Sequence, residues 1–352
     1  MRFNRPERGI ARPLPVLVAG ALLALALPVM AQKTTLLVYT ALETDQLKAY
    51  QEGFNKVNPD IELKWVRDST GVVTAKLLAE KANPQADVVM GVAASSLALL
   101  DKNGMLEPYR PLNADAIMSQ YIDKKNPPAW FGMDVWGATV CFNTVEAAKK
   151  GIPKPETWKD LLKPAYKGQI VMPNPASSGT GFFDVTAWLT LWGDKNGAGD
   201  GWKYMDGLHA NMAQYTHSGS KPCNMAAAGE YVVGISFEYR ANANKAKGAP
   251  IDLVFPKEGL GWDLEAIGIH KGTKQQAAAQ KLVDWAVSDP AMALYAKNFA
   301  IVAVPSLSQP LPNVPANYGS MLAKNDFAWA AKNRDKILAE WSRRYESKAA
   351  PK

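Results

Sequence analysis

The sequence predicts an α/β protein built from two lobes, and three observations support this prediction. Over residues 33–104, apolar runs of strand length alternate with segments whose apolar residues recur at helical spacing, as in parallel strands joined by helical crossovers. Near residue 135 this order changes, and a second series of elements begins. Beyond residue 31 about 320 residues remain, more than a single hydrophobic core normally holds.

The elements of the first series follow one another without long gaps. Leu47, Tyr50 and Phe54 lie at helical spacing, and Asn58-Pro59 ends that helix. The run at 61–67 alternates like a strand, and glycine closes the helix at 94–104. The expected order is strand 33–42, helix 44–59, strand 61–67, a helix opened by 69–71, strand 86–92 and helix 94–104.

The second series is less regular. Residues 154–175 have the pattern of a helix, a loop and a strand, and 220–240 that of a helix followed by a strand that ends in a polar cluster. Glycines interrupt the apolar run at 252–269, which predicts two bent strands. Further helices are expected at 182–192, 199–212, 275–288 and 290–299.

Residues 1–31 have the pattern of a cleavable secretory signal peptide. A basic head with four arginines precedes an apolar run at 16–27, and Ala31 stands at the expected cleavage point. Twelve apolar residues fall short of the ~20 that span a bilayer, which disfavours a membrane anchor. We therefore expect a periplasmic protein whose mature chain begins near Gln32.

Charge and cysteine content narrow the function classes. Without residues 1–31, which carry four arginines and one glutamate, the formal charge falls from +7 to +4. No basic block remains of the kind that nucleic-acid binding needs. Three scattered histidines and two cysteines give no zinc-type spacing. Cys141 and Cys223 are expected to form a disulfide in an oxidising compartment, the alternative being two separate buried thiols. We expect a monomer without a cofactor or metal.

Five segments resemble the type 2 periplasmic solute-binding proteins of ABC importers. They are LLVYTALE, ADVVMGV, PETWKDLL, AAAGEYVVGISFEYR and LVDWAVSDPAMALYAKNF, which together extend over nearly all of the chain after residue 31. Within that class the sequence is most similar to the iron- and phosphonate-binding branch, and there to 2-aminoethylphosphonate-binding proteins.

The resemblance implies a specific lobe division and partner. Lobe 1 would hold residues 32–136 and 262–352, lobe 2 residues 137–261, and the chain would cross between them at 135–141 and 254–263. The solute would lie in the cleft between the lobes and pass to an ABC permease in the inner membrane.

Four junctions between strands and helices are the candidate ligand contacts, because ligands of open α/β sheets lie beyond the carboxyl ends of strands. They are the stretches 40–43, 69–71, 177–181 and 218–220, three of them rich in Ser, Thr and Gly. Each could be a plain helix N-cap. Together, hydroxyls and free N–H groups at helix N-termini suit a tetrahedral oxyanion. The expected phosphonate contacts are Ser69, Thr70, Ser177, Ser178, Gly179, Thr180, Ser218, Tyr239 and Arg240.

The stretch Phe237-Glu238-Tyr239-Arg240 argues against ferric iron. The resemblance implies that iron-binding relatives place two adjacent tyrosines there, and often a histidine after the first strand, where this chain has Glu43. Arg240 would instead hold phosphonate oxygens in a bidentate manner.

An amino-phosphonate also needs a partner for its ammonium group. Glu43, Glu238 and Asp263 are the candidates, although Glu43 could simply complement a helix dipole. Trp136 and Trp262 could enclose the ethyl linker or merely pack at the lobe crossings. Thr40 and Leu42 complete the expected contact set.

The sequence offers little support for an enzyme. The 177–181 stretch lacks the Gly-Lys-Ser/Thr ending of a nucleotide-binding loop, and neither a G-x-S-x-G nor an H-E-x-x-H motif occurs. We therefore expect a binding protein for 2-aminoethylphosphonate or a related phosphonate. The alternatives are another anion such as phosphate or sulfate, then ferric iron or a polyamine.

Overall fold

The computed structural model describes residues 1–4, 9, 33–193 and 199–351. Most of the predicted signal peptide therefore lies outside the described residues. From Lys33 onward the chain forms a compact unit in which helices and strands alternate, which confirms the predicted α/β class. None of the described helices has the length and apolarity needed to cross a membrane.

The strands and helices have the following bounds. The strands are β1 (Thr34–Thr40), β2 (Ile61–Arg67), β3 (Val88–Ala93), β4 (Leu106–Glu107), β5 (Phe131–Asn143), β6 (Ile170–Pro173), β7 (Met212–Thr216), β8 (Val233–Phe237), β9 (Ile251–Val254), β10 (Trp262–His270) and β11 (Ile301–Val302). The helices are α1 (Thr44–Asn55), α2 (Thr70–Ala79), α3 (Ala94–Lys102), α4 (Thr144–Lys150), α5 (Gly179–Leu191), α6 (Gly201–Asn211), α7 (Lys221–Ala227), α8 (Glu238–Ala246), α9 (Gln276–Ala286), α10 (Asp289–Lys297), α11 (Tyr318–Met321) and α12 (Phe327–Tyr345).

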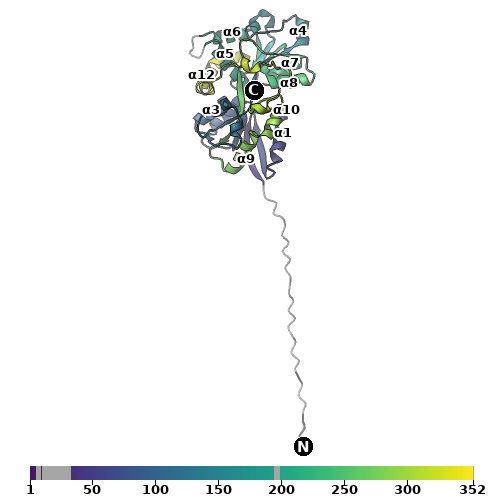
Figure 1. The fold of residues 1–352 in the computed structure, drawn as a ribbon, viewed down its shortest axis with the longest axis vertical. Coiled ribbons are helices and arrows are strands. Elements are labelled where there is room, and N and C mark those ends of the chain that lie inside the picture. Colours follow the sequence, from purple (N-terminus) through teal and green to yellow (C-terminus); the bar gives the residue numbers. More distant parts are fainter. Residues whose placement is uncertain (5–8, 10–32, 194–198, 352) are drawn as a thin grey trace. The chain divides into compact units, whose positions relative to one another are not determined.

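The long strand β5 connects the two halves of the sheet. The strand order is β2-β1-β3-β10-β5-β8-β6-β7. The first part of β5 pairs antiparallel with β10, and its second part pairs antiparallel with β8 and β9. On either side lie parallel pairs, β1 with β2 and β3, and β6 with β7 and β8. Figure 1 shows α1, α9 and α10 near the first half and α4 to α8 near the second.

Two large apolar cores correspond to the two halves. In the first, the rings of Phe54 and Trp285 meet edge to face with centroids 5.8 Å apart. In the second, the rings of Trp158 and Trp188 do so at 5.2 Å. Separate cores support the lobe division that we propose, with its boundaries at residues 136–137 and 261–262.

Helix α12 adds a detail to that division. It was assigned from the sequence to the first lobe, yet its Trp341 and Tyr345 belong to the second core. Figure 1 shows α12 next to α5, and the Arg334 guanidinium of α12 lies 4.5 Å from the ring centre of Phe182 on α5. Helix α12 also packs against α3 of the first half, so the C-terminal helix contacts both halves.

Three local predictions differ from the structure. Residues 154–166 form two short 3₁₀ turns, Lys159–Leu162 and Pro164–Tyr166, rather than a helix, because Pro164 lacks the N–H that would continue one. Helix α8 starts directly after β8, where only a polar cluster was expected. Helix α12 was not predicted, although Asp326 caps it by accepting a hydrogen bond from the Trp329 N–H at 2.9 Å.

Asp184 of α5 predicts a pH-dependent stability. Its side chain is fully buried, and neither carboxylate oxygen has a hydrogen-bond partner. Burial raises its pKa well above the usual range, so the folded state keeps a proton that the unfolded state loses above its pKa of about 3.9. The contribution of this proton to the free energy of unfolding is fully present below about pH 4. It is lost as the pH rises toward the pKa of Asp184 in the folded state.

We therefore expect the free energy of unfolding in urea to fall between pH 4 and pH 8, and Asp184→Asn to reduce this fall. The exposed Glu230→Gln variant is the control and should keep the wild-type slope. An unchanged slope in Asp184→Asn contradicts the assignment.

Candidate functional site

A cavity lies where β1, β2 and β3 end and the N-termini of α2 and α5 meet. Its volume is ≈ 40 Å³, and a single water needs roughly 10–15 Å³. The lining residues are Ala41, Glu43, Arg67, Ser69, Thr70, Gly91, Trp136, Ser178, Gly179, Thr180, Ser218, Gly219, Phe237, Tyr239 and Glu265.

Three Ser/Thr/Gly clusters predicted from the sequence all contribute to this lining. They stand at the start of α2, at the start of α5 and before α7. Glycine permits their close approach: a Cβ on Gly179 would lie 2.9 Å from Thr70 Oγ1, and one on Gly219 would collide with Thr180 Oγ1. The cavity thus collects hydroxyls and helix N-terminal N–H groups from three separate segments, the donor set that suits an oxyanion.

Ser177 is the member of these clusters that points elsewhere. Its hydroxyl donates to the carbonyl oxygen of His217 at 2.7 Å, and its own carbonyl accepts from the Gly71 N–H at 2.8 Å. A Cβ at Gly71 would collide with the carbonyl of Ala176. Ser177 therefore joins the α5 and α2 loops, while Ser178 and Thr180 face the cavity.

Arg67 is the cation of the lining, and it was not among the ligand contacts predicted from the sequence. Its Nε donates to the carbonyl oxygen of Leu42 at 2.9 Å, and its Nη2 lies 3.7 Å from Glu43 Oε2. The signal in the sequence was its place at the end of β2, two residues before the Ser69 cluster.

Arg240 lies outside the lining residues, contrary to the expectation that it faces the anion. It is buried, and its guanidinium donates to both oxygens of Asp45 at 3.1 and 3.2 Å. Its Nη2 is also 3.3 Å from Glu43 Oε2. Both partners stand at the N-terminus of α1, so Arg240 links α8 to α1 beside the cavity.

Of the three acids predicted for an amine, Glu43 alone lines the cavity. Glu238 is fully buried and accepts from the Gly137 N–H at 2.7 Å, and burial raises its pKa to about 8. Asp263 accepts from the Leu264 N–H at 2.7 Å and from the Ser95 N–H at 3.4 Å at the start of α3, and burial raises its pKa to about 7. Both carboxylates therefore accept hydrogen bonds from backbone N–H groups of the crossing strands and of α3.

Glu265 takes the place expected for those two acids. It lines the cavity while only 5% exposed, and it accepts a hydrogen bond from Tyr239 Oη at 3.0 Å. Burial raises its pKa to about 7, against the lowering effect of the Tyr239 hydrogen bond. Its sequence signal was a charged residue within an otherwise apolar strand, a pattern that does not show which way the side chain points.

The remaining predicted residues divide between cavity and core. Trp136 lines the cavity and donates from Nε1 to Thr180 Oγ1 at 3.3 Å. Thr40 accepts from the Leu42 N–H at 3.1 Å and, like Leu42, is buried outside the lining. Trp262 donates to the Ala323 carbonyl at 2.8 Å and lines a different pocket.

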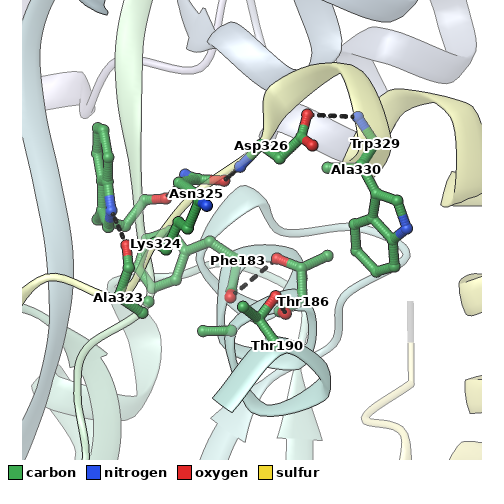
Figure 2. Close-up of a pocket in the computed structure, with 12 residues that line it drawn as sticks. Phe183, Thr186, Thr190, Ala323, Lys324, Asn325, Asp326, Trp329 and Ala330 are labelled. Atoms are coloured by element: carbon green, nitrogen blue, oxygen red, sulfur yellow. Dashed lines mark hydrogen bonds between the residues drawn. The ribbon is translucent and has the colours of Figure 1, made fainter. Parts of the chain in front are cut away.

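That second pocket lies between α5 and the segment leading into α12. Figure 2 shows Thr186 and Thr190 of α5 facing this segment. Thr186 donates to the Phe183 carbonyl at 3.0 Å and Asp326 accepts from the Trp329 N–H, so these polar groups already have partners within the chain. With a volume of ≈ 10 Å³, the pocket has room for about one water.

Metal ligands are not gathered in the described part of the chain, where no group of three His, Cys, Asp or Glu side chains could hold an ion. The histidines have other partners. His209 lies 2.9 Å from Tyr215 Oη, His217 lies 3.2 Å from Asp68, and His270 contacts the Lys271 carbonyl at 3.0 Å.

Known proteins resemble this chain over most of its length. An uncharacterized protein of Haemophilus influenzae is 32% identical over 294 residues, 82% of this chain and 81% of its own length. A probable ABC transporter periplasmic-binding protein, y4fP, of Sinorhizobium fredii is 28% identical over 72% of this chain and 70% of its own length.

A solved structure extends the similarity to the fold. The periplasmic binding protein AfuA of Actinobacillus pleuropneumoniae, with exogenous fructose-6-phosphate bound, is 30% identical. It aligns with a TM-score of 0.82 over 89% of this chain and 99% of its own. This match confirms the predicted type 2 periplasmic-binding-protein fold.

The family model for bacterial extracellular solute-binding proteins matches residues 83–333. This family and the similar structures consist of binding proteins rather than enzymes. The chain belongs to the bacterial extracellular solute-binding protein family and is a periplasmic solute-binding protein of the ABC-importer type.

Proposed function

We propose that the protein captures 2-aminoethylphosphonate, or a closely related small aminophosphonate, and delivers it to an ABC permease in the inner membrane. One observation supports this above all: a single cavity is lined by oxyanion donors and Arg67 together with the carboxylates of Glu43 and Glu265. A ligand with a phosphoryl anion at one end and an ammonium at the other matches both.

The phosphonate end would bind at the helix N-termini. Ser69, Thr70, Ser178 and Thr180 are each no more than 6% exposed, so an anion among them is largely removed from water. Buried anions need hydrogen-bond donors or a counter-charge, and helix N-termini together with an arginine supply both.

The ammonium end would lie toward Glu265 and Trp136. A carboxylate provides the charge partner that a desolvated ammonium requires. The Trp136 indole, with its Nε1 fixed by Thr180, offers an apolar surface for a two-carbon linker.

A sugar phosphate is the second candidate, because the AfuA structure contains fructose-6-phosphate and carboxylates also accept hydrogen bonds from hydroxyls. The small cavity favours the more compact aminophosphonate. A hexose phosphate would require the walls to move apart.

Ligand binding is expected to favour approach of the two lobes, as in hinge closure of periplasmic binding proteins. The contacts of Arg240 with Glu43 and Asp45 would then stabilise the closed form without touching the ligand. We expect Arg240→Met to weaken 2-aminoethylphosphonate binding roughly 10-fold, mainly through faster dissociation. Calorimetry and stopped-flow kinetics measure both, and complete loss of binding would indicate instead that Arg240 contacts the phosphonate directly.

A thermal-shift panel tests the proposed ligand class. At ~100 times its Kd, a ligand should add about 2.7 kcal/mol to stability. We expect 2-aminoethylphosphonate to raise Tm most, ethylphosphonate and inorganic phosphate less, and sulfate, spermidine and ferric citrate not at all. A shift with sulfate or spermidine alone contradicts the proposal, and one with fructose-6-phosphate alone favours the second candidate.

A further inference from the structure

Two carboxylic acids face each other across the central strands. In the antiparallel register of β5 and β10, Asp134 is the direct partner of Glu265. Asp134 is 1% exposed, and neither of its carboxylate oxygens has a hydrogen-bond donor. Like charges directly opposite each other destabilise a sheet, and a buried charge without a partner is costly. The two acids can be accommodated together if one of them keeps a proton.

None of the described ionisable groups that most affect Asp134 and Glu265 is a cation, although Arg67 lines the same cavity as Glu265. The ionisable side chains that interact electrostatically with this pair are themselves acids and phenols. They are Glu43 just before α1, Tyr50 of α1, Glu238 and Tyr239 of α8, and Tyr295 of α10. The guanidinium groups of Arg67 and Arg240 are directed to Glu43, and that of Arg240 also to Asp45.

Within the pair the two acids differ in access. Glu265 lines the cavity, whereas Asp134 does not. Tyr239 Oη already donates to Glu265 Oε1, and Asp134 stands directly opposite Glu265 in the strand register. A protonated Asp134 can donate a second hydrogen bond to Glu265, and two donors hold the Glu265 carboxylate in one orientation toward the cavity.

We propose that Glu265 is the carboxylate that receives the ligand's ammonium group, and that a protonated Asp134 holds it in place as a positioning residue. This inference rests on the proposed function, since it names the receptor for one end of the same ligand. It replaces Glu238 and Asp263, whose carboxylates are bound to backbone N–H groups, as partners of the amine.

The proposal has a consequence for pH. Because burial raises the pKa of Glu265 to about 7, part of the free protein carries a proton on Glu265 below that pH. The ammonium needs the ionised form, so binding expels this proton into the solvent. Preference for an amine-bearing ligand should therefore increase from pH 5.5 to pH 8.

The experiment compares 2-aminoethylphosphonate with ethylphosphonate, which lacks the amine but keeps the phosphonate and the two carbons. Isothermal titration measures both Kd values for the wild type, Glu265→Gln, Asp134→Asn and Asp134→Leu at pH 5.5, 7 and 8. Because the ammonium lowers the second pKa of the phosphonate beside it, the affinity ratio of the two ligands in each variant is compared with the wild-type ratio at the same pH. Titrations in two buffers of different ionisation enthalpy give the number of protons released on binding.

We expect Glu265→Gln to weaken 2-aminoethylphosphonate roughly 30-fold or more at pH 8, since it removes the charge partner of a buried ammonium. Ethylphosphonate should change less than about 3-fold, and the affinity ratio should vary less with pH than it does in the wild type. Asp134→Asn still donates a hydrogen bond and should stay within about 3-fold of wild type, whereas Asp134→Leu should lose roughly 10-fold for the amine ligand alone.

The outcomes separate this inference from the proposed function. If the wild type binds neither phosphonate, the proposed function fails and the inference fails with it. If it binds both and Glu265→Gln weakens both equally, or neither, the inference alone is overturned. Equal effects of both Asp134 variants on both ligands would assign Asp134 a purely structural role.

Discussion

Arg67→Ala is expected to weaken phosphonate binding at least 100-fold. Arg67 is the cation among the lining residues, and its Nε is held by the Leu42 carbonyl at 2.9 Å. Without it, the bound dianion would face only neutral donors while Glu43 remains nearby. Loss of a partner to a buried charge costs about 2–5 kcal/mol, and about 1.4 kcal/mol corresponds to tenfold in Kd.

Two variants make this expectation specific, and isothermal titration measures each. Arg67→Lys keeps the charge but loses the planar fork, so a loss of roughly 10-fold is expected. Lys64→Ala, at an exposed position of the same strand β2, removes a cation away from the cavity and should leave Kd unchanged. An unaltered Kd in Arg67→Ala, or a larger loss in Arg240→Met, would contradict the role given to Arg67.

Removal of the disulfide is expected to cause a large loss of stability. A disulfide joins Cys141 of β5 and Cys223 of α7, whose Cα atoms are 5.3 Å apart and which are 82 positions apart in sequence. Restriction of a loop of this length in the unfolded chain contributes roughly 4 kcal/mol. For a domain of about 320 residues, this corresponds to a fall in Tm of roughly 6 °C.

Thermal unfolding with and without a reductant measures this effect. The Cys141→Ala/Cys223→Ala double variant should unfold at the lower temperature and respond no further to reductant. Since neither cysteine lines the cavity, the folded double variant should bind ligand as the wild type does. A reductant-insensitive Tm in the wild type would show that the bridge contributes nothing.

The Ser/Thr/Gly clusters of the site could be predicted from the sequence because their positions depend only on where strands end and helices begin. Strand ends and helix starts can be located from apolar periodicity, and parallel strands bring their carboxyl ends to one edge. For that reason the clusters containing Thr70, Thr180 and Ser218 were found without knowledge of their neighbours.

The roles of the charged residues could not be predicted, because they depend on partners that are far away in the sequence. Arg240 faces Asp45, 195 residues away in sequence, and no local pattern reveals that this pair removes Arg240 from the cavity. Glu265 and Asp263 are two residues apart on β10, yet one lines the cavity and the other holds the N-terminus of α3.

Helix α12 could have been predicted from periodicity. Its buried positions Ala330, Ile337 and Trp341 recur at helical spacing after an Asp cap. The lobe to which α12 belongs could not have been predicted from periodicity. Only its packing against the second core shows where the inner face of the helix lies.

The central claim is that one small ligand carries both a phosphoryl anion and an ammonium. Calorimetric titration of the wild-type protein with 2-aminoethylphosphonate, and in parallel with fructose-6-phosphate, tests it most directly. We predict one ligand per chain and an affinity for 2-aminoethylphosphonate at least 100-fold higher, about 2.7 kcal/mol. Tighter binding of fructose-6-phosphate, or no heat with 2-aminoethylphosphonate, would contradict the account.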